Sequence, residues 1–75
     1  MAKLKKLSGY ETIKILCNTF SFSAKRQSGS HIILVREGGE RAGCVVPLHK
    51  ELKIGTLKGI LKQAGVAEED FAAAQ

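Results

Sequence analysis

The sequence predicts an α+β fold: a two-layer sandwich in which a three-stranded antiparallel sheet carries two helices on one face. Two stretches, one near the start and one in the last third, repeat apolar residues at helical spacing. Between them lie three short segments of strand character, separated by turns that contain glycine. Strands joined by short turns pair antiparallel, and each helix then buries its apolar stripe on the sheet. A chain of 75 residues is expected to form one small domain over residues 1–75.

The first helix is predicted at residues 8–19. Ser8 and Glu11 have the spacing of a capping box, in which the serine hydroxyl accepts from the Glu11 amide and the glutamate side chain reaches back. Apolar residues then recur at helical spacing as far as Phe20. Tyr10 fits either the surface of this helix or the core, and the sequence does not decide between them.

Three strands are predicted next. Residues 20–27 alternate apolar and polar side chains, which predicts a strand with one face inward, followed by a turn at residues 28–29. Residues 30–36 and 41–48 are predicted as the second and third strands, joined by a hairpin turn at residues 37–40.

The second and third strands are apolar on both faces, at residues 32–35 and 44–46. Pro47 ends the third strand or places it at an edge of the sheet, because proline cannot donate a ladder hydrogen bond. Helices on one face leave the other face open, and an open apolar sheet face usually marks a partner surface. Shielding of the edges by the termini is the alternative explanation.

The second helix is predicted at residues 54–64, with Gly65 as its left-handed cap. Gly55 and Gly59 are poor residues for a helix interior, so we expect them to permit close packing on the sheet.

The two ends of the chain are predicted to differ from the middle. Residues 66–71 are typical of a short last turn of helix, with Phe71 docked on the core. We expect residues 72–75 to fray and residues 1–7 to form a mobile basic arm that includes Lys3, Lys5 and Lys6.

Positive charge is concentrated in most of the chain. The net charge is +5, but residues 1–66 hold all twelve Lys and Arg residues and four of the seven acids, which leaves +8 there. A basic body on a small domain indicates a polyanionic partner, most simply a nucleic acid. The alternative is an ordinary solvated surface.

Several other classes of protein are disfavoured. No apolar run approaches the length needed to cross a bilayer, so no membrane partner is expected. The basic start lacks the apolar stretch of a secretory signal, so we expect a cytoplasmic location. Cys17 and Cys44 are far apart and belong to no CxxC motif. We expect both to be small buried residues, and we expect no metal and no cofactor.

His31 is the main candidate for chemistry. It begins a predicted strand directly after Gly29, in a segment that contains Lys25 and Arg26. A histidine imidazole can take or give a proton in catalysis, while the basic residues would attract phosphate. This arrangement is compatible with a metal-free site for phosphodiester cleavage. The alternative is a polar residue at the start of the strand that hydrogen-bonds the turn.

The chain resembles the HicA toxins of bacterial and archaeal toxin–antitoxin pairs. The specific elements are Leu-Lys-x-Gly-Thr-Leu and Ile-Leu-Lys-Gln-Ala-Gly within residues 46–65, together with residues 7–9 and 27–31, and the resemblance covers residues 4–71. It implies the α-β-β-β-α topology of double-stranded-RNA-binding domains. It also implies a ribosome-independent mRNA interferase that is neutralised by a HicB antitoxin. The catalytic residue of the family matches His31, and its accompanying glycine matches Gly29.

Two positions depart from the usual pattern of the family. Many relatives have a second histidine or an aromatic residue where this chain has Ile32-Ile33, and Thr19-Phe20 replaces a common Gly-Phe. Neither change affects His31, so the substrate contacts are less well defined than the catalytic group. His49 is either the general acid for the leaving oxygen or a loop residue. The candidate RNA-binding residues are Lys25, Arg26, Ser28, Ser30, His49, Lys50 and Lys53.

Three functions are therefore compared. The first is an RNA-cleaving toxin, a metal-independent endoribonuclease with mRNA and an antitoxin as partners. The second is a non-catalytic RNA-binding domain of the same topology. The third is a small interaction domain whose charge binds an acidic protein.

Overall fold

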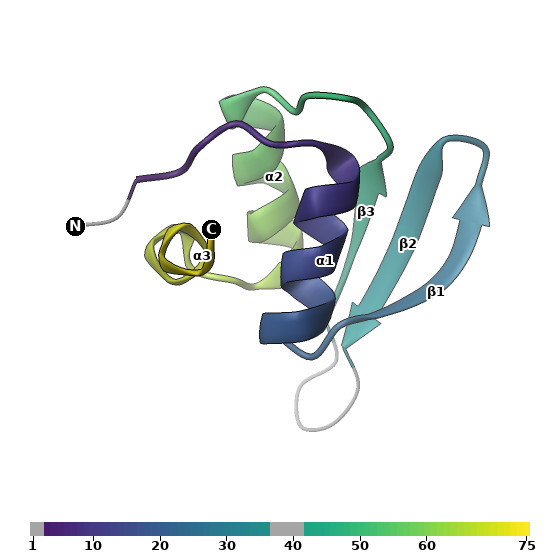
Figure 1. Ribbon diagram of the computed structural model, residues 1–75. Coiled ribbons are helices and arrows are strands. Elements are labelled where there is room, and N and C mark those ends of the chain that lie inside the picture. The colour runs from purple at the N-terminus through teal and green to yellow at the C-terminus, as the bar shows by residue number, and fades with distance from the viewer. Residues whose placement is uncertain (1–2, 37–41) are drawn as a thin grey trace.

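The computed structural model describes residues 3–36 and 42–75 and confirms the predicted α+β class. A three-stranded antiparallel sheet lies on one side of the molecule and the helices lie on the other (Figure 1). The α-β-β-β-α order holds, with one further short helix at the end. The elements are α1 (Gly9–Thr19), β1 (Ser23–Ser28), β2 (His31–Arg36), β3 (Ala42–Pro47), α2 (Ile54–Ala64) and α3 (Glu68–Ala74).

The strands are arranged in the order β1-β2-β3, so β2 is central and both of its neighbours are edge strands. In the register of β2 with β3, His31 is opposite Pro47 and Leu34 is opposite Cys44. Pro47 is the last residue of an edge strand, so both expectations for it hold. The hairpin turn predicted at residues 37–40 lies outside the described residues.

The core lies between the sheet and the helices. Leu16 of α1, Leu34 of β2, Val46 of β3 and Leu57 of α2 are completely buried there. Phe71 of α3 is also fully buried, as predicted. Its ring stacks on that of Phe20, with 6.2 Å between the ring centroids. Aromatic pairs at this distance add to the stabilisation that burial provides.

The opposite face of the sheet carries apolar side chains that no helix covers. Along β2, side chains alternate between faces, so Ile33 and Val35 lie opposite the buried Leu34 and are half-buried. Val45 of β3 pairs with Ile33 and remains 41% exposed. The two-sided apolar pattern in the sequence therefore corresponds to one core face and one open face.

The first strand begins later than predicted, and the expectation that it buries one face is wrong. It starts at Ser23, and all six of its residues are exposed. Ser21 has a φ of 62°, a left-handed conformation that interrupts extended backbone. Phe22 is buried before the strand begins. The alternation that suggested a strand instead reflects Phe20 and Phe22 anchoring an irregular connection to the core.

The helix signals in the sequence are confirmed. The amide of Glu11 donates to Ser8 Oγ and the amide of Ser8 donates to Glu11 Oε1, both at 3.1 Å. Helix α2 has the predicted bounds, and Gly65 caps it with a φ of 70°. The expected packing role of Gly55 and Gly59 is wrong, because a Cβ at either position would meet no atom within 4 Å.

The chain ends are more ordered than expected. Leu7 is buried, and its carbonyl accepts a 2.8 Å hydrogen bond from the Leu52 amide. The Gln75 side chain accepts from the Lys5 amide at 2.9 Å and donates to the Lys5 carbonyl at 2.8 Å. Ala72 is buried within α3. Within the described residues, the segment expected to form a mobile arm is therefore bound to the body, and residues 72–74 are helical.

The two cysteines are free, and only one of them fits the prediction of burial. Cys44 is buried, whereas Cys17 is half-buried on α1. Burial raises the pKa of the Cys44 thiol to about 11, with a smaller contribution from the neighbouring Cys17. Neither residue belongs to a group of three or more potential metal ligands among the described residues.

Candidate functional site

His31 lies at the end of the sheet where β1 turns into β2. Gly29 has a φ of 61°, which glycine adopts without strain, and its carbonyl accepts a 2.8 Å hydrogen bond from Gln27 Nε2. Ser28 and His31 are the paired residues on either side of the turn. The His31 residue is exposed although its backbone is held in the central strand. The structure thus places an accessible imidazole on a rigid element.

His31 is on the face of the sheet that carries no helices. Side chains alternate along a strand, so His31 is on the opposite face from Leu34, which is fully buried under the helices. Arg26 pairs with Ile33, and Ile33 is two residues from His31, so Arg26 shares the face of His31. A guanidinium group and an imidazole therefore lie on the same open face.

His49 lies at the same end of the sheet as His31. The ladder between β2 and β3 continues past the last strand residue, because the Leu48 amide donates to the Ser30 carbonyl at 2.7 Å. His49 follows directly, and it is exposed. The sequence did not place the two histidines relative to each other, and the strand register puts both at the same end of the sheet.

The start of α1 also contributes to this region, together with the turn between β1 and β2 and the end of β3. The Gly9 amide donates to the His49 carbonyl at 2.9 Å. A Cβ at Gly9 would overlap the Pro47 carbonyl oxygen, so only glycine allows the helix to approach the strand this closely. In Figure 1, the start of α1, the end of β3 and the turn between β1 and β2 lie at one end of the molecule. We call residues 9–10, 28–31 and 47–49 the histidine end.

The predicted RNA-binding residues are distributed unevenly around the histidine end. Lys25 and Arg26 are exposed on β1, where the strand register shifts between Ala24 and Arg26. Lys50 is exposed and directly follows His49. Lys53 is also exposed, but it lies at the N-cap of α2. Among the described residues, no hydrogen bond or ion pair joins Lys53 to the histidine end.

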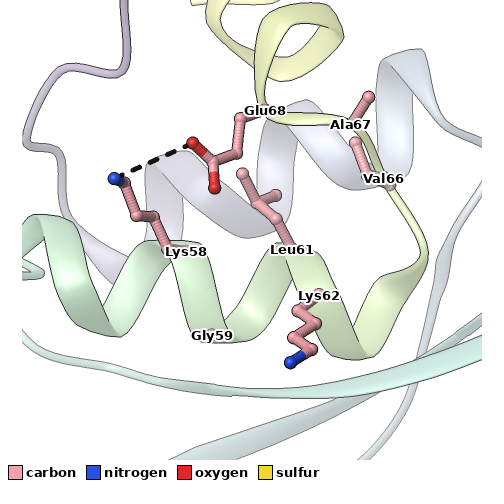
Figure 2. A pocket seen from close by; sticks show the side chains of 7 residues that line it. All are labelled: Lys58, Gly59, Leu61, Lys62, Val66, Ala67 and Glu68. Carbon is pink, nitrogen blue, oxygen red and sulfur yellow. Dashed lines mark ion pairs between the residues drawn. The ribbon is translucent and has the colours of Figure 1, made fainter.

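A separate groove lies between α2 and α3. Figure 2 shows the side chains that line it, with Leu61 beside the ion pair of Lys58 with Glu68, whose atoms are 4.0 Å apart, and with Val66 next to Ala67. Its volume is about 420 Å³. None of the residues predicted to act on RNA lines this groove. The candidate chemistry is therefore on an open surface, as expected for a domain of this size.

Sequence reasoning missed the contribution of α1 to the site. In the sequence, Gly9 stands only at the start of the predicted helix, and its contact with the Pro47–His49 segment joins residues that are far apart in the chain. A glycine directly after the N-cap Ser8, where a helix former would be more stable, was the available signal.

The structure defines a small, open-faced α+β domain in which an exposed histidine lies beside basic residues. The family model of the HicA toxin of bacterial toxin–antitoxin systems matches residues 9–66. The chain therefore belongs to the HicA toxin family and is a toxin of the toxin–antitoxin class, which implies an antitoxin partner. Comparisons with curated proteins and with solved structures give no match. The matched region includes the whole histidine end.

A search of the described residues for a membrane-spanning helix gives a negative result: none of the helices there combines sufficient length with sufficient apolar character.

Proposed function

We propose that the protein is a ribosome-independent mRNA interferase, an endoribonuclease that cleaves mRNA in the cytoplasm and thereby stops translation. The observation that carries the proposal is His31, exposed on the open face of the sheet in a chain of a toxin family. An exposed imidazole on a rigid strand can reach an extended nucleic acid strand, which a deep pocket would exclude.

In the proposed reaction, His31 acts as the general base. It removes the proton from a ribose 2′-hydroxyl, and the 2′-oxygen attacks the adjacent phosphorus. The bond from phosphorus to the 5′-oxygen of the next nucleotide breaks, which leaves a 2′,3′-cyclic phosphate and a free 5′-hydroxyl. His49 is the candidate general acid that protonates the departing oxygen, because the register places it at the same end as His31. This chemistry requires no metal ion or cofactor.

Charged residues near the histidines would hold the substrate. Arg26 shares the open face with His31. Lys25 is exposed directly before Arg26, and Lys50 is exposed directly after His49. These cations would bind phosphates on both sides of the cleaved bond, while Ser28 and Ser30 supply hydroxyl groups at the turn. Lys53 would contact the RNA strand farther from the cleaved phosphate.

The expected antitoxin is a HicB protein. We propose that it covers the histidine end and the adjoining open face, where Val45 is 41% exposed. An acidic or apolar surface laid there would block access of RNA to His31 and satisfy the positive charge of β1.

A non-catalytic RNA-binding domain is the second candidate function. It is favoured by β1, whose six residues are all exposed and include Lys25 and Arg26. Such a surface binds phosphates whether or not cleavage follows.

The decisive experiment compares the parent protein with His31→Ala on a long unstructured RNA, with and without EDTA. General-base catalysis contributes about 10²–10⁴-fold, so cleavage should fall by that factor while the melting temperature stays unchanged. Ser23→Ala, an exposed change at the other end of β1, is the control and should cleave like the parent. Cleavage by His31→Ala at the parent rate would refute the assignment. RNA binding without any cleavage by the parent would favour the second function.

A further inference from the structure

Tyr10 is an aromatic residue left on the surface. Its exposed fraction is 71%, and it lies in the first turn of α1. The chain has three phenylalanines, one tyrosine and no tryptophan. Phe71 is buried and stacked on Phe20, and Phe22 is buried with the Arg36 guanidinium 5.2 Å from its ring centroid. Tyr10 is therefore the one aromatic side chain of the sequence that the core does not use.

Tyr10 directly follows the residue whose backbone is bonded to the His49 segment. Its neighbour Gly9 donates to the His49 carbonyl at 2.9 Å, and the Leu48 amide donates to the Ser30 carbonyl at 2.7 Å. These bonds connect the first turn of α1 to the residue that precedes His31. Side chains of a helix tilt toward its N-terminus, which is the end of α1 that meets the His49 segment.

We infer that Tyr10 is a stacking platform for an unpaired RNA base next to the cleaved phosphate, and that the substrate is single-stranded at that point. This inference deepens the proposed RNA cleavage and rests on it. The cations of the site would bind phosphates, which every nucleotide carries, so they do not distinguish one nucleotide from the next. A base stacked on an aromatic ring fixes one nucleotide, and only a base outside a duplex offers a free face for this contact.

Tyr10 would have a positioning role and not a chemical one. Its ring would orient the nucleotide whose 2′-hydroxyl faces His31, while the imidazole carries out the proton transfer. Loss of the ring should therefore weaken binding and raise KM more than it lowers kcat. The tyrosine hydroxyl is not needed for stacking, so phenylalanine should replace it.

The test measures binding of a short single-stranded RNA by fluorescence anisotropy, with His31→Ala present in every variant to prevent cleavage. Because base stacking on an aromatic residue contributes to affinity, adding Tyr10→Ala should raise the dissociation constant about tenfold. Tyr10→Phe should bind like the parent background. Thr19→Ala, an exposed change at the far end of α1, is the control and should have no effect.

A second measurement identifies the stacked nucleotide. The RNA is prepared with one abasic position at a time, and binding is compared with and without Tyr10→Ala. The effect of the substitution should vanish when one particular base is missing and persist for the others. A fully paired duplex of the same sequence should show no effect of Tyr10→Ala.

Several results would overturn the inference. They are unchanged RNA binding by Tyr10→Ala, an equal loss in Tyr10→Phe, or an effect that is the same for every abasic position. Weaker antitoxin binding with unchanged RNA binding would also overturn it and would assign Tyr10 to the protein interface. Failure of the proposed cleavage would be recognised separately, by His31→Ala cutting RNA at the parent rate.

Discussion

The helix-covered side of the sheet and the histidine end share the same strands but are built differently. On the covered side, Leu34 and Val46 are completely buried among side chains from all three helices. At the histidine end, His31 and His49 are exposed, and the elements are joined by backbone hydrogen bonds of 2.7 and 2.9 Å. The covered side is held together by apolar packing, and the histidine end is held together by backbone hydrogen bonds.

This difference separates stability from the proposed activity. Removing a buried side chain leaves a cavity, whereas removing an exposed histidine leaves the backbone ladder unchanged. Substitutions at His31 or Tyr10 should therefore alter RNA cleavage or binding without altering folding. The two regions are coupled at Gly9, where α1 contacts the Pro47–His49 segment.

Gly9→Ala tests that coupling and should have the largest effect on stability. The added Cβ would overlap the Pro47 carbonyl oxygen, so α1 or β3 must move. Overpacking of this kind costs about 1–3 kcal/mol of unfolding free energy, which thermal or urea denaturation measures. Because the movement shifts the His49 segment, RNA cleavage should fall as well.

Gly59→Ala is the matched control for Gly9→Ala. A Cβ at Gly59 meets no atom within 4 Å, and the residue lies inside α2. Alanine is the better helix former, so this variant should be more stable by up to about 1 kcal/mol and should cleave RNA normally. Equal melting temperatures for Gly9→Ala and the parent would show that the two regions are not coupled there.

Much of the fold was predictable because its signals are local. The capping box of Ser8 with Glu11 and the αL cap at Gly65 each involve residues that are close in the chain, and both are confirmed. The apolar runs of β2 and β3 also identified their strands. The start of β1 was missed, because the φ of 62° at Ser21 accompanies the burial of Phe22, which depends on the assembled core.

The candidate site shows the same division. His31 could be proposed from the sequence, because a glycine turn before an apolar strand is a local pattern. The position of His49 at the same end of the sheet could not, since it depends on pairing between β2 and β3. The contact of Gly9 with the same segment depends on how α1 packs, and so does the exposure of Tyr10. Residues that are far apart in the sequence and meet only in the folded chain produce no local sequence pattern from which their contact could be predicted.

Neutralising the cations of β1 should have an intermediate effect, on RNA affinity alone. Lys25→Gln with Arg26→Gln removes two exposed charges beside the histidine end. For single-stranded RNA, each phosphate contact contributes about 0.7 to the slope of log K against log salt, so the slope should decrease by about 1 to 2. Anisotropy titrations at several salt concentrations measure this slope, and the melting temperature should not change.

The double variant Lys58→Gln with Lys62→Gln removes the same amount of positive charge and is the control for the Lys25 and Arg26 double variant. Both lysines line the groove between α2 and α3, and no residue of the histidine end lines that groove. If RNA binds at the proposed site, the loss of Lys58 and Lys62 should change the slope of log K against log salt less than the loss of Lys25 and Arg26 does. An equal change in both double variants would mean that RNA responds to net charge and not to a defined surface.

Cys44 provides the smallest expected effect and a test of the covered side alone. Burial raises the pKa of its thiol from the ordinary value of 9.0 to about 11, with a further contribution from Cys17. Between these values the unfolded chain loses the thiol proton while the folded chain retains it, so the free energy of unfolding should decrease as pH rises from 9 to 11.

Cys44→Ala should be less stable at neutral pH, because it leaves a cavity, but it should lack this part of the decrease in the free energy of unfolding. The difference between the two pH profiles should be on the order of 1 kcal/mol by urea denaturation. Comparing the two profiles removes the titration of lysines, which both proteins share. Profiles that fall in parallel would mean that the Cys44 thiol is not protected by the core. RNA affinity should be the same for both proteins at neutral pH, because Cys44 is buried on the helix-covered side and the proposed RNA site is on the other face of the sheet.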